Sequence, residues 1–134
     1  TGGVMAVILW ALFAVALLPY LARLPVARAM NQLGGYDNHL PRAQQARLEG
    51  MGARANAAHY NSFEALQLFL AAVLGCVVSG NYDLTMQVLA WLYVGCRVAF
   101  ILLYLLDYAL LRSIVWVVGV GAVFSMIVRA ALSV

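Results

Sequence analysis

Four long apolar runs constrain the fold of this chain more than any other feature. A helix of about 20 such residues can cross the hydrocarbon layer of a membrane. The composition agrees, because 66% of the residues are hydrophobic and only 10% are charged, whereas soluble domains average about half and about a quarter. We therefore predict an all-α integral membrane protein that folds as a four-transmembrane-helix bundle. The four spans cover about residues 6–21, 52–78, 84–106 and 113–133.

Domain organisation follows from these spans. No internal repeat or low-complexity segment divides the chain, so residues 5–134 are predicted to form a single membrane domain. Residues 1–4 precede Met5 and are interpreted as a remnant of expression. Asp83 is the expected N-cap of the third span. The expected connections are residues 25–51, 79–83 and 108–111.

Arginine positions predict the orientation of the bundle. All eight basic residues are arginine, and no basic cluster lies on a soluble face, so no nucleic-acid partner is expected. Arg28, Arg42 and Arg47 lie in the long first connection, which the positive-inside rule assigns to the cytoplasm. The link before Arg112 is then also cytoplasmic and both termini face the other side, as expected for an inner (cytoplasmic) membrane protein. Arg129 is the one charge that departs from this pattern.

A polar strip on the second span indicates a functional site. Arg54, Asn61 and Glu64 are spaced seven and three residues apart, which puts them on one face of a helix. Glu64 lies more than a turn inside the apolar run. An ionisable side chain at that depth is unfavourable by a few kcal/mol or more unless it is paired or faces a polar cavity. We therefore expect this strip to carry the function.

The third span supplies an opposite charge at the same depth. Counted from the cytoplasmic end, Glu64 and Arg97 both lie roughly 15–18 Å deep. We expect them to interact, either directly or through a ligand. The spacing of Tyr93, Arg97, Phe100 and Tyr104 makes a single stripe on the third helix. Together these residues predict a polar crevice that opens to the cytoplasm.

The fourth span is predicted to begin at Arg112 and Ser113. A helix N-terminus has free N–H groups and a partial positive charge. With an added guanidinium and hydroxyl, this setting would stabilise a thiolate. The alternative is that Arg112 sits at the lipid headgroups, paired with Asp107.

Other reactive residue types have ordinary explanations. Cys76 and Cys96 are expected to be small core residues. His39 and His59 are isolated, and the sequence has no Cys, His and Asp cluster at ligand spacing, so no metal site is expected.

Taken in order, these motifs resemble the MAPEG family, the membrane-associated proteins in eicosanoid and glutathione metabolism, and we expect a bacterial member. The resemblance covers nearly the whole chain. The matching residues are Arg54-Ala55, Asn61-x-x-Glu64, Phe69, Arg97-Val98-Ala99, Tyr104 and Arg112-Ser113.

The resemblance implies a homotrimer that binds glutathione as cosubstrate between neighbouring subunits, without a metal. Arg112 and Ser113 would be catalytic, because they would stabilise the glutathione thiolate. An arginine near the end of the first span would come from the adjacent subunit, with Arg23 the first candidate and Arg28 the second. The implied glutathione-binding residues are Arg23, Arg54, Asn61, Glu64, Arg97 and Tyr104.

Three positions depart from the family pattern. Ala57 stands where glutathione-using eukaryotic members have an arginine, and Phe100 and Trp116 stand at positions that are polar in some members. Either Arg54 or Arg47 replaces the missing arginine, or the site binds something else.

Three functions remain open. The first is a glutathione-dependent transferase or peroxidase that acts on a lipophilic small-molecule electrophile entering from the membrane lipids. The second is a non-catalytic lipid-binding or scaffold member of the same family with a diverged glutathione site. The third is a small four-span transporter, which would also use one membrane carboxylate such as Glu64.

Overall fold

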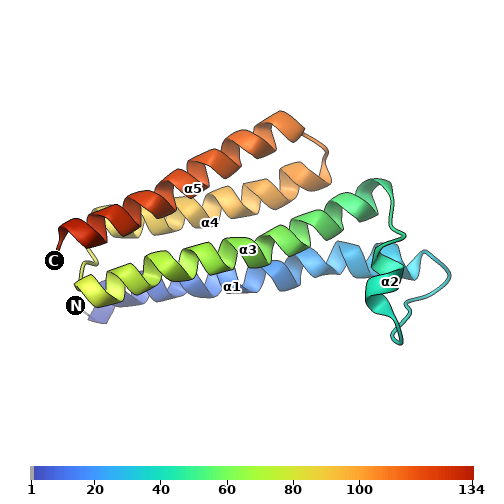
Figure 1. Cartoon of the computed structure of the whole chain (residues 1–134), viewed down its shortest axis with the longest axis horizontal. Coiled ribbons are helices and arrows are strands. Elements are labelled where there is room, and N and C mark those ends of the chain that lie inside the picture. Colours follow the sequence, from blue (N-terminus) through green and yellow to red (C-terminus); the bar gives the residue numbers. More distant parts are fainter. Residues whose placement is uncertain (1) are drawn as a thin grey trace.

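The computed structural model describes residues 2–134, and four of its helices are long and apolar enough to cross a membrane (Figure 1). This confirms the predicted all-helical chain with four apolar spans. A fifth, short helix lies in the first connection. The helices are α1 (Gly2–Asn31), α2 (Pro41–Gln45), α3 (Gly50–Ser79), α4 (Leu84–Leu105) and α5 (Ala109–Leu132).

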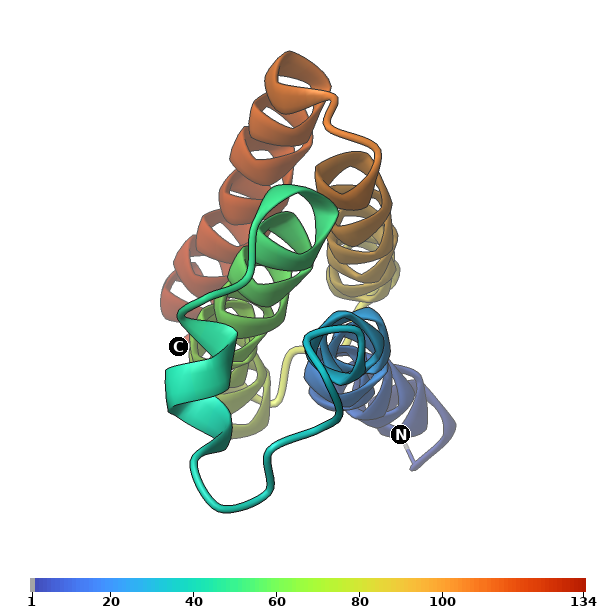
Figure 2. The ribbon, with the colours of Figure 1, turned by 90° about the vertical axis from the view of Figure 1, so that its right-hand side faces the viewer.

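The long helices form two pairs. α1 packs mainly against α3, and α4 packs mainly against α5. The connection that contains α2 and the link between α4 and α5 lie at one end of the bundle, with both termini at the other (Figure 1). Figure 2 looks along the bundle from the α2 end and shows the four long helices around a shared interior.

The first helix is longer than the sequence predicted. The expected span ended near Leu21 with a loop from Pro25, but α1 continues through Pro19 and Pro25 to Asn31. Each proline removes only one backbone hydrogen bond, whereas buried Val26 and Met30 in the extension pack against α3. The first connection is therefore residues 32–49 and not 25–51.

A buried glutamine organises this first connection. Gln44 is 2% exposed, and its Nε2 donates to the carbonyl oxygens of Met30 (3.1 Å) and Gly35 (2.8 Å). Its Oε1 accepts a hydrogen bond from the backbone N–H of Asp37 at 2.9 Å. A buried amide with satisfied donors and acceptors holds a loop in one conformation. No local signal in the sequence indicates this role of Gln44.

The link between α4 and α5 is shorter and lies earlier than predicted. Asp107 adopts a left-handed conformation (φ 64°), which ends α4. The backbone N–H of Tyr108 donates to Leu103 O at 2.9 Å, and that of Asp107 donates to Tyr104 O at 3.2 Å. This is the hydrogen-bond pattern of a Schellman C-cap. The link is therefore residues 106–108, and the prediction that residues 108–111 form it was wrong.

The opposite end of the bundle is closed by Asp83. Its Oδ1 accepts from the backbone N–H of Met86 at 2.9 Å, which confirms the predicted N-cap of α4. Its Oδ2 lies 2.7 Å from Arg129 Nη2 near the end of α5. The Met86 hydrogen bond, followed by Arg129, holds the pKa of Asp83 below its usual value. Arg129, the exception in the charge pattern, is thus paired with a carboxylate.

Aromatic stacking and a glycine bring the helices close together at mid-bundle. Tyr93 of α4 stacks on Phe69 of α3 with ring centroids 5.1 Å apart, and its hydroxyl donates to Ala65 O at 3.0 Å. A Cβ at Gly119 of α5 would lie 3.2 Å from the Cβ of Cys96. Both cysteines, Cys76 and Cys96, are free and buried, as predicted.

Candidate functional site

Two adjoining cavities form a groove between α3, α4 and α5. The larger, about 460 Å³, lies near the α4–α5 link. The smaller, about 120 Å³, lies deeper in the bundle. Asn61 and Trp116 line both cavities, and we call the two together the α3–α5 groove. Among its lining residues are six of the predicted site residues, Asn61, Glu64, Arg97, Tyr104, Arg112 and Ser113.

Arg97 is the buried charge of this groove. It is 3% exposed, and its Nη2 donates to Asn61 Oδ1 at 2.6 Å. Its guanidinium carbon lies 4.1 Å from the centroid of the Phe100 ring. The buried Nε has no hydrogen-bond partner, and within residues 2–134 no carboxylate lies within 4.0 Å of this guanidinium. A cation in this position attracts an anionic ligand, because an unpaired buried charge is strongly unfavourable.

Glu64 and Arg97 share the smaller cavity but do not touch. Asn61 lies between them, since its Oδ1 accepts from Arg97 and its Nδ2 approaches Glu64 Oε2 at 3.5 Å. Glu64 and Arg97 were predicted to interact either directly or through a ligand, and within residues 2–134 the direct contact is absent. The Glu64 side chain is exposed on the surface of the isolated chain although it lies inside an apolar helix. Apart from the long contact with Asn61, its carboxylate has no partner within residues 2–134.

Arg112 stands at the wider end of the groove. Its guanidinium carbon lies 4.3 Å from the centroid of the Tyr104 ring, and Tyr104 makes an edge contact with Phe100 at 5.6 Å. Because α5 begins at Ala109, Arg112 is its fourth residue and Ser113 its fifth. The prediction that these two residues open the helix was wrong, since the α4–α5 link ends three residues earlier than expected. The free N–H groups lie one turn before Arg112, so its own charge is the main electropositive feature here.

Arg54 lies outside the groove. Its Nη2 donates to Leu105 O at 3.4 Å and its Nη1 is 4.0 Å from Asp107 Oδ2. This arginine therefore ties α3 to the end of α4, and it takes the carboxylate that was suggested as a partner of Arg112. Arg47 precedes the first residue of α3 and lines a different cavity. Neither Arg54 nor Arg47 lines the α3–α5 groove.

Arg23 lies in a separate cavity between α1, α2 and α3. This cavity is about 450 Å³ and contains two arginines, Arg23 and Arg42. Arg23 Nη2 donates to the Tyr36 hydroxyl at 2.9 Å, while its buried Nη1 has no partner. Arg42 donates to the Tyr60 hydroxyl at 3.2 Å. Arg42 and Tyr60 were not predicted as site residues, because their contact depends on the placement of α2.

His59 and the metal-ligating residue types were also considered as candidates from the sequence. The ring Nδ1 of His59 lies 2.7 Å from Pro19 O, which joins α3 to α1. Within residues 2–134, no three His, Cys, Asp or Glu side chains gather as metal ligands.

A comparison with protein families agrees with the four-span architecture. Curated proteins and solved structures give no match. A family model described as "MAPEG family" matches residues 7–132, which is nearly the whole chain and includes all four membrane helices apart from their outermost residues. This chain is an integral membrane protein that belongs to the MAPEG family.

Proposed function

We propose that this protein is a glutathione-dependent membrane enzyme that conjugates or reduces a lipophilic electrophile. The observation that carries the proposal is the buried guanidinium of Arg97, which has an amide partner and no carboxylate partner within residues 2–134. Membership in a family associated with glutathione and eicosanoid metabolism supports the choice of ligand.

The groove residues fit the chemical groups of glutathione. Glutathione has two carboxylates, one ammonium group and one thiol. Arg97 and Asn61 offer donors to a carboxylate, and Glu64 offers a negative charge to the ammonium group. The larger cavity, about 460 Å³, lies within the usual range of small-molecule sites.

Arg112 would act on the sulfur. When bound, glutathione supplies the thiolate nucleophile, and a nearby cation favours the thiolate over the thiol. The guanidinium is held over the Tyr104 ring, and the Ser113 hydroxyl lines the same cavity. Trp116 and Val117 give that cavity an apolar wall, against which a lipophilic substrate from the bilayer would pack.

The proposal includes a homotrimer. The exposed carboxylate of Glu64 lies within a membrane helix, and such a group is normally covered by protein, ligand or water. A neighbouring subunit would cover it and contribute Arg23, whose buried Nη1 lacks a partner. Light scattering in mild detergent is expected to give three copies. A monomer with intact helicity would contradict this assembly.

The roles of the groove residues can be separated by two measurements. Arg112→Ala is expected to abolish the thiolate absorbance of bound glutathione near neutral pH, with little change in affinity by calorimetry. Glu64→Ala and Asn61→Ala are expected to weaken affinity, because they would hold the peptide portion. Arg129→Ala, at the opposite end of the bundle, is the control and should change neither quantity. Equal thiolate signals in wild type and Arg112→Ala would exclude the proposed role of Arg112.

A second candidate is a non-catalytic lipid-binding or scaffold role. Arg54 is engaged with the end of α4, so no arginine compensates for Ala57. Phe100 and Trp116 also make the groove less polar. In this case, titration of glutathione into the solubilised protein would release no heat at millimolar ligand.

A further inference from the structure

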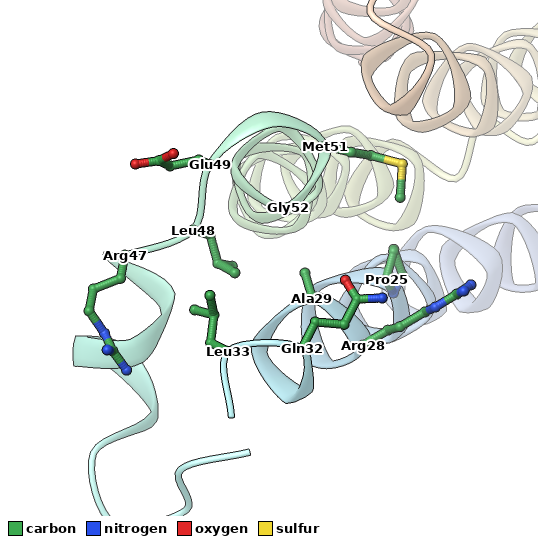
Figure 3. A pocket seen from close by; sticks show the side chains of 10 residues that line it. All are labelled: Pro25, Arg28, Ala29, Gln32, Leu33, Arg47, Leu48, Glu49, Met51 and Gly52. Carbon is green, nitrogen blue, oxygen red and sulfur yellow. The ribbon is translucent and has the colours of Figure 1, made fainter. Parts of the chain in front are cut away.

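Another cavity lies outside the α3–α5 groove. It measures about 630 Å³ and lies between the last turns of α1, the end of the first connection and the first turn of α3 (Figure 3). Its residues are Pro25, Arg28, Ala29, Gln32, Leu33, Arg47, Leu48, Glu49, Met51 and Gly52.

Two arginines that have no contact partner within residues 2–134 line this cavity. Six of the eight arginines in the chain make a hydrogen bond, an ion pair or a contact with an aromatic ring. Within residues 2–134, the guanidinium groups of the remaining two, Arg28 and Arg47, make none of these. Both side chains are exposed and both line the same cavity.

The two charges flank an apolar surface. In Figure 3, Arg47 and Arg28 lie on opposite sides of Leu33, Leu48 and Ala29. Glu49 also lines the cavity, and its carboxylate points away from these apolar side chains (Figure 3). Cations beside an apolar surface suit an amphiphile that has an anionic head.

Close packing forms the floor of this cavity. A Cβ at Gly52 would lie 3.0 Å from the Cβ of Ala29 and 3.2 Å from Leu48 Cδ2. The first turn of α3 therefore rests directly on α1, and the cavity lies where these two helices meet the 32–49 connection.

The position along the bundle indicates where the ligand comes from. Both arginines lie at the end of the bundle that carries the 32–49 connection, where the apolar part of α1 gives way to polar residues. Lipid headgroups lie at this level of a membrane helix. Basic pockets between helices on the cytoplasmic side are typical binding sites for anionic lipid headgroups. Arginine is also suited to phosphate, because its planar fork donates two parallel hydrogen bonds.

We propose that this cavity binds an anionic phospholipid, with Arg28 and Arg47 attracting its anionic headgroup from either side and Leu33 and Leu48 contacting its apolar part. The cavity shares no residue with the α3–α5 groove, although Arg28 is also the second candidate for the arginine that a neighbouring subunit would contribute to glutathione binding. Arg47→Gln therefore tests the lipid site separately from the glutathione proposal. The lipid would join α1 to α3 at the end of the bundle where Gln44 organises the connection.

Native mass spectrometry of the full-length protein tests the proposal. The purified protein is incubated with equal amounts of phosphatidylglycerol and phosphatidylcholine of matched acyl chains, and the ratio of retained lipids is measured. Arg28→Gln and Arg47→Gln are each expected to lower the preference for phosphatidylglycerol about fivefold. Arg42→Gln is the matched control, because it removes the same charge from the connection that contains Arg47, at a residue that already contacts Tyr60. Circular dichroism verifies that each variant is folded.

The outcomes are distinct. A loss of preference in Arg28→Gln and Arg47→Gln, with Arg42→Gln unchanged and Arg28→Lys retaining most of it, supports the site. An equal loss in Arg42→Gln would show a general charge effect and overturn the proposal. If millimolar inorganic phosphate binds the wild type but not Arg28→Gln or Arg47→Gln, and the wild type shows no preference for phosphatidylglycerol, the cavity takes a soluble phosphate and not a lipid, which also overturns the proposal.

Discussion

The hydrogen bond between Asn61 and Arg97 is expected to stabilise the bundle more than most polar contacts in a membrane. Interhelical hydrogen bonds in bilayers average about 0.6 kcal/mol, because the unfolded chain finds other partners. This bond is charge-assisted, 2.6 Å long, and made by a side chain that is 3% exposed. Its loss would leave the Arg97 guanidinium only the face of the Phe100 ring. We therefore expect Asn61→Ala to destabilise the protein by about 1.5–3 kcal/mol.

Thermal unfolding in mild detergent, followed by tryptophan fluorescence, measures this effect. For a chain of this size, the expected fall in Tm is roughly 6–12 °C. Gln67→Ala is the control, because Gln67 is an exposed amide on α3, and within residues 2–134 its side chain makes no hydrogen bond. Its Tm should change by about 2 °C or less.

A double-mutant cycle tests the cause. Asn61→Ala is also measured in an Arg97→Met background, where the guanidinium is absent. If the effect of Asn61→Ala arises from Arg97, most of it should disappear in that background. An equal fall in Tm in both backgrounds would refute the reasoning, because Asn61 would then stabilise the protein through some other contact.

Three further predictions follow from other parts of the bundle. Because folding lowers the pKa of Asp83, its contribution to folding stability is present above the usual aspartate pKa and is lost as pH falls toward the lower folded value. Asp83→Asn should therefore flatten the acid limb of a curve of Tm against pH. A curve unchanged from wild type would contradict this prediction. Gly119→Leu should destabilise by about 1–3 kcal/mol, since a Cβ there meets Cys96 at 3.2 Å, whereas Gly121→Leu meets open space and should cause little change in Tm. Gln44→Leu should increase proteolysis of the 32–49 connection, because it removes three hydrogen bonds; equal cleavage rates would argue against this role.

Local sequence signals predicted most of the helical framework. Four apolar runs were enough to place four membrane helices, and Asp83 was identified as the cap of α4. The end of α1 was not predictable from local signals, because two prolines favour a break there and only packing of Val26 against α3 overrides them. The start of α5 was also missed, since it depends on the left-handed conformation of Asp107.

The candidate site was predicted in part. Asn61, Glu64 and Arg97 stood out because polar and charged side chains are rare inside apolar runs, and they do lie together in one groove. Their partners were less predictable, since Asn61 separates the two charges. Arg54 shares a helix face with Asn61 but contacts the end of α4.

The sequence by itself determined which segments enter the membrane, because hydrophobicity along a helix is a local property that no neighbour changes. It also determined which side chains need a partner at depth, since that follows from charge and solvation alone. Only the tertiary structure decided the identity of each partner. An arginine side chain is long enough to reach several neighbours, so its contact depends on which helices meet, at what separation, and where each helix ends. For this reason Arg97 and Arg54, both predicted site residues, lie in different surroundings.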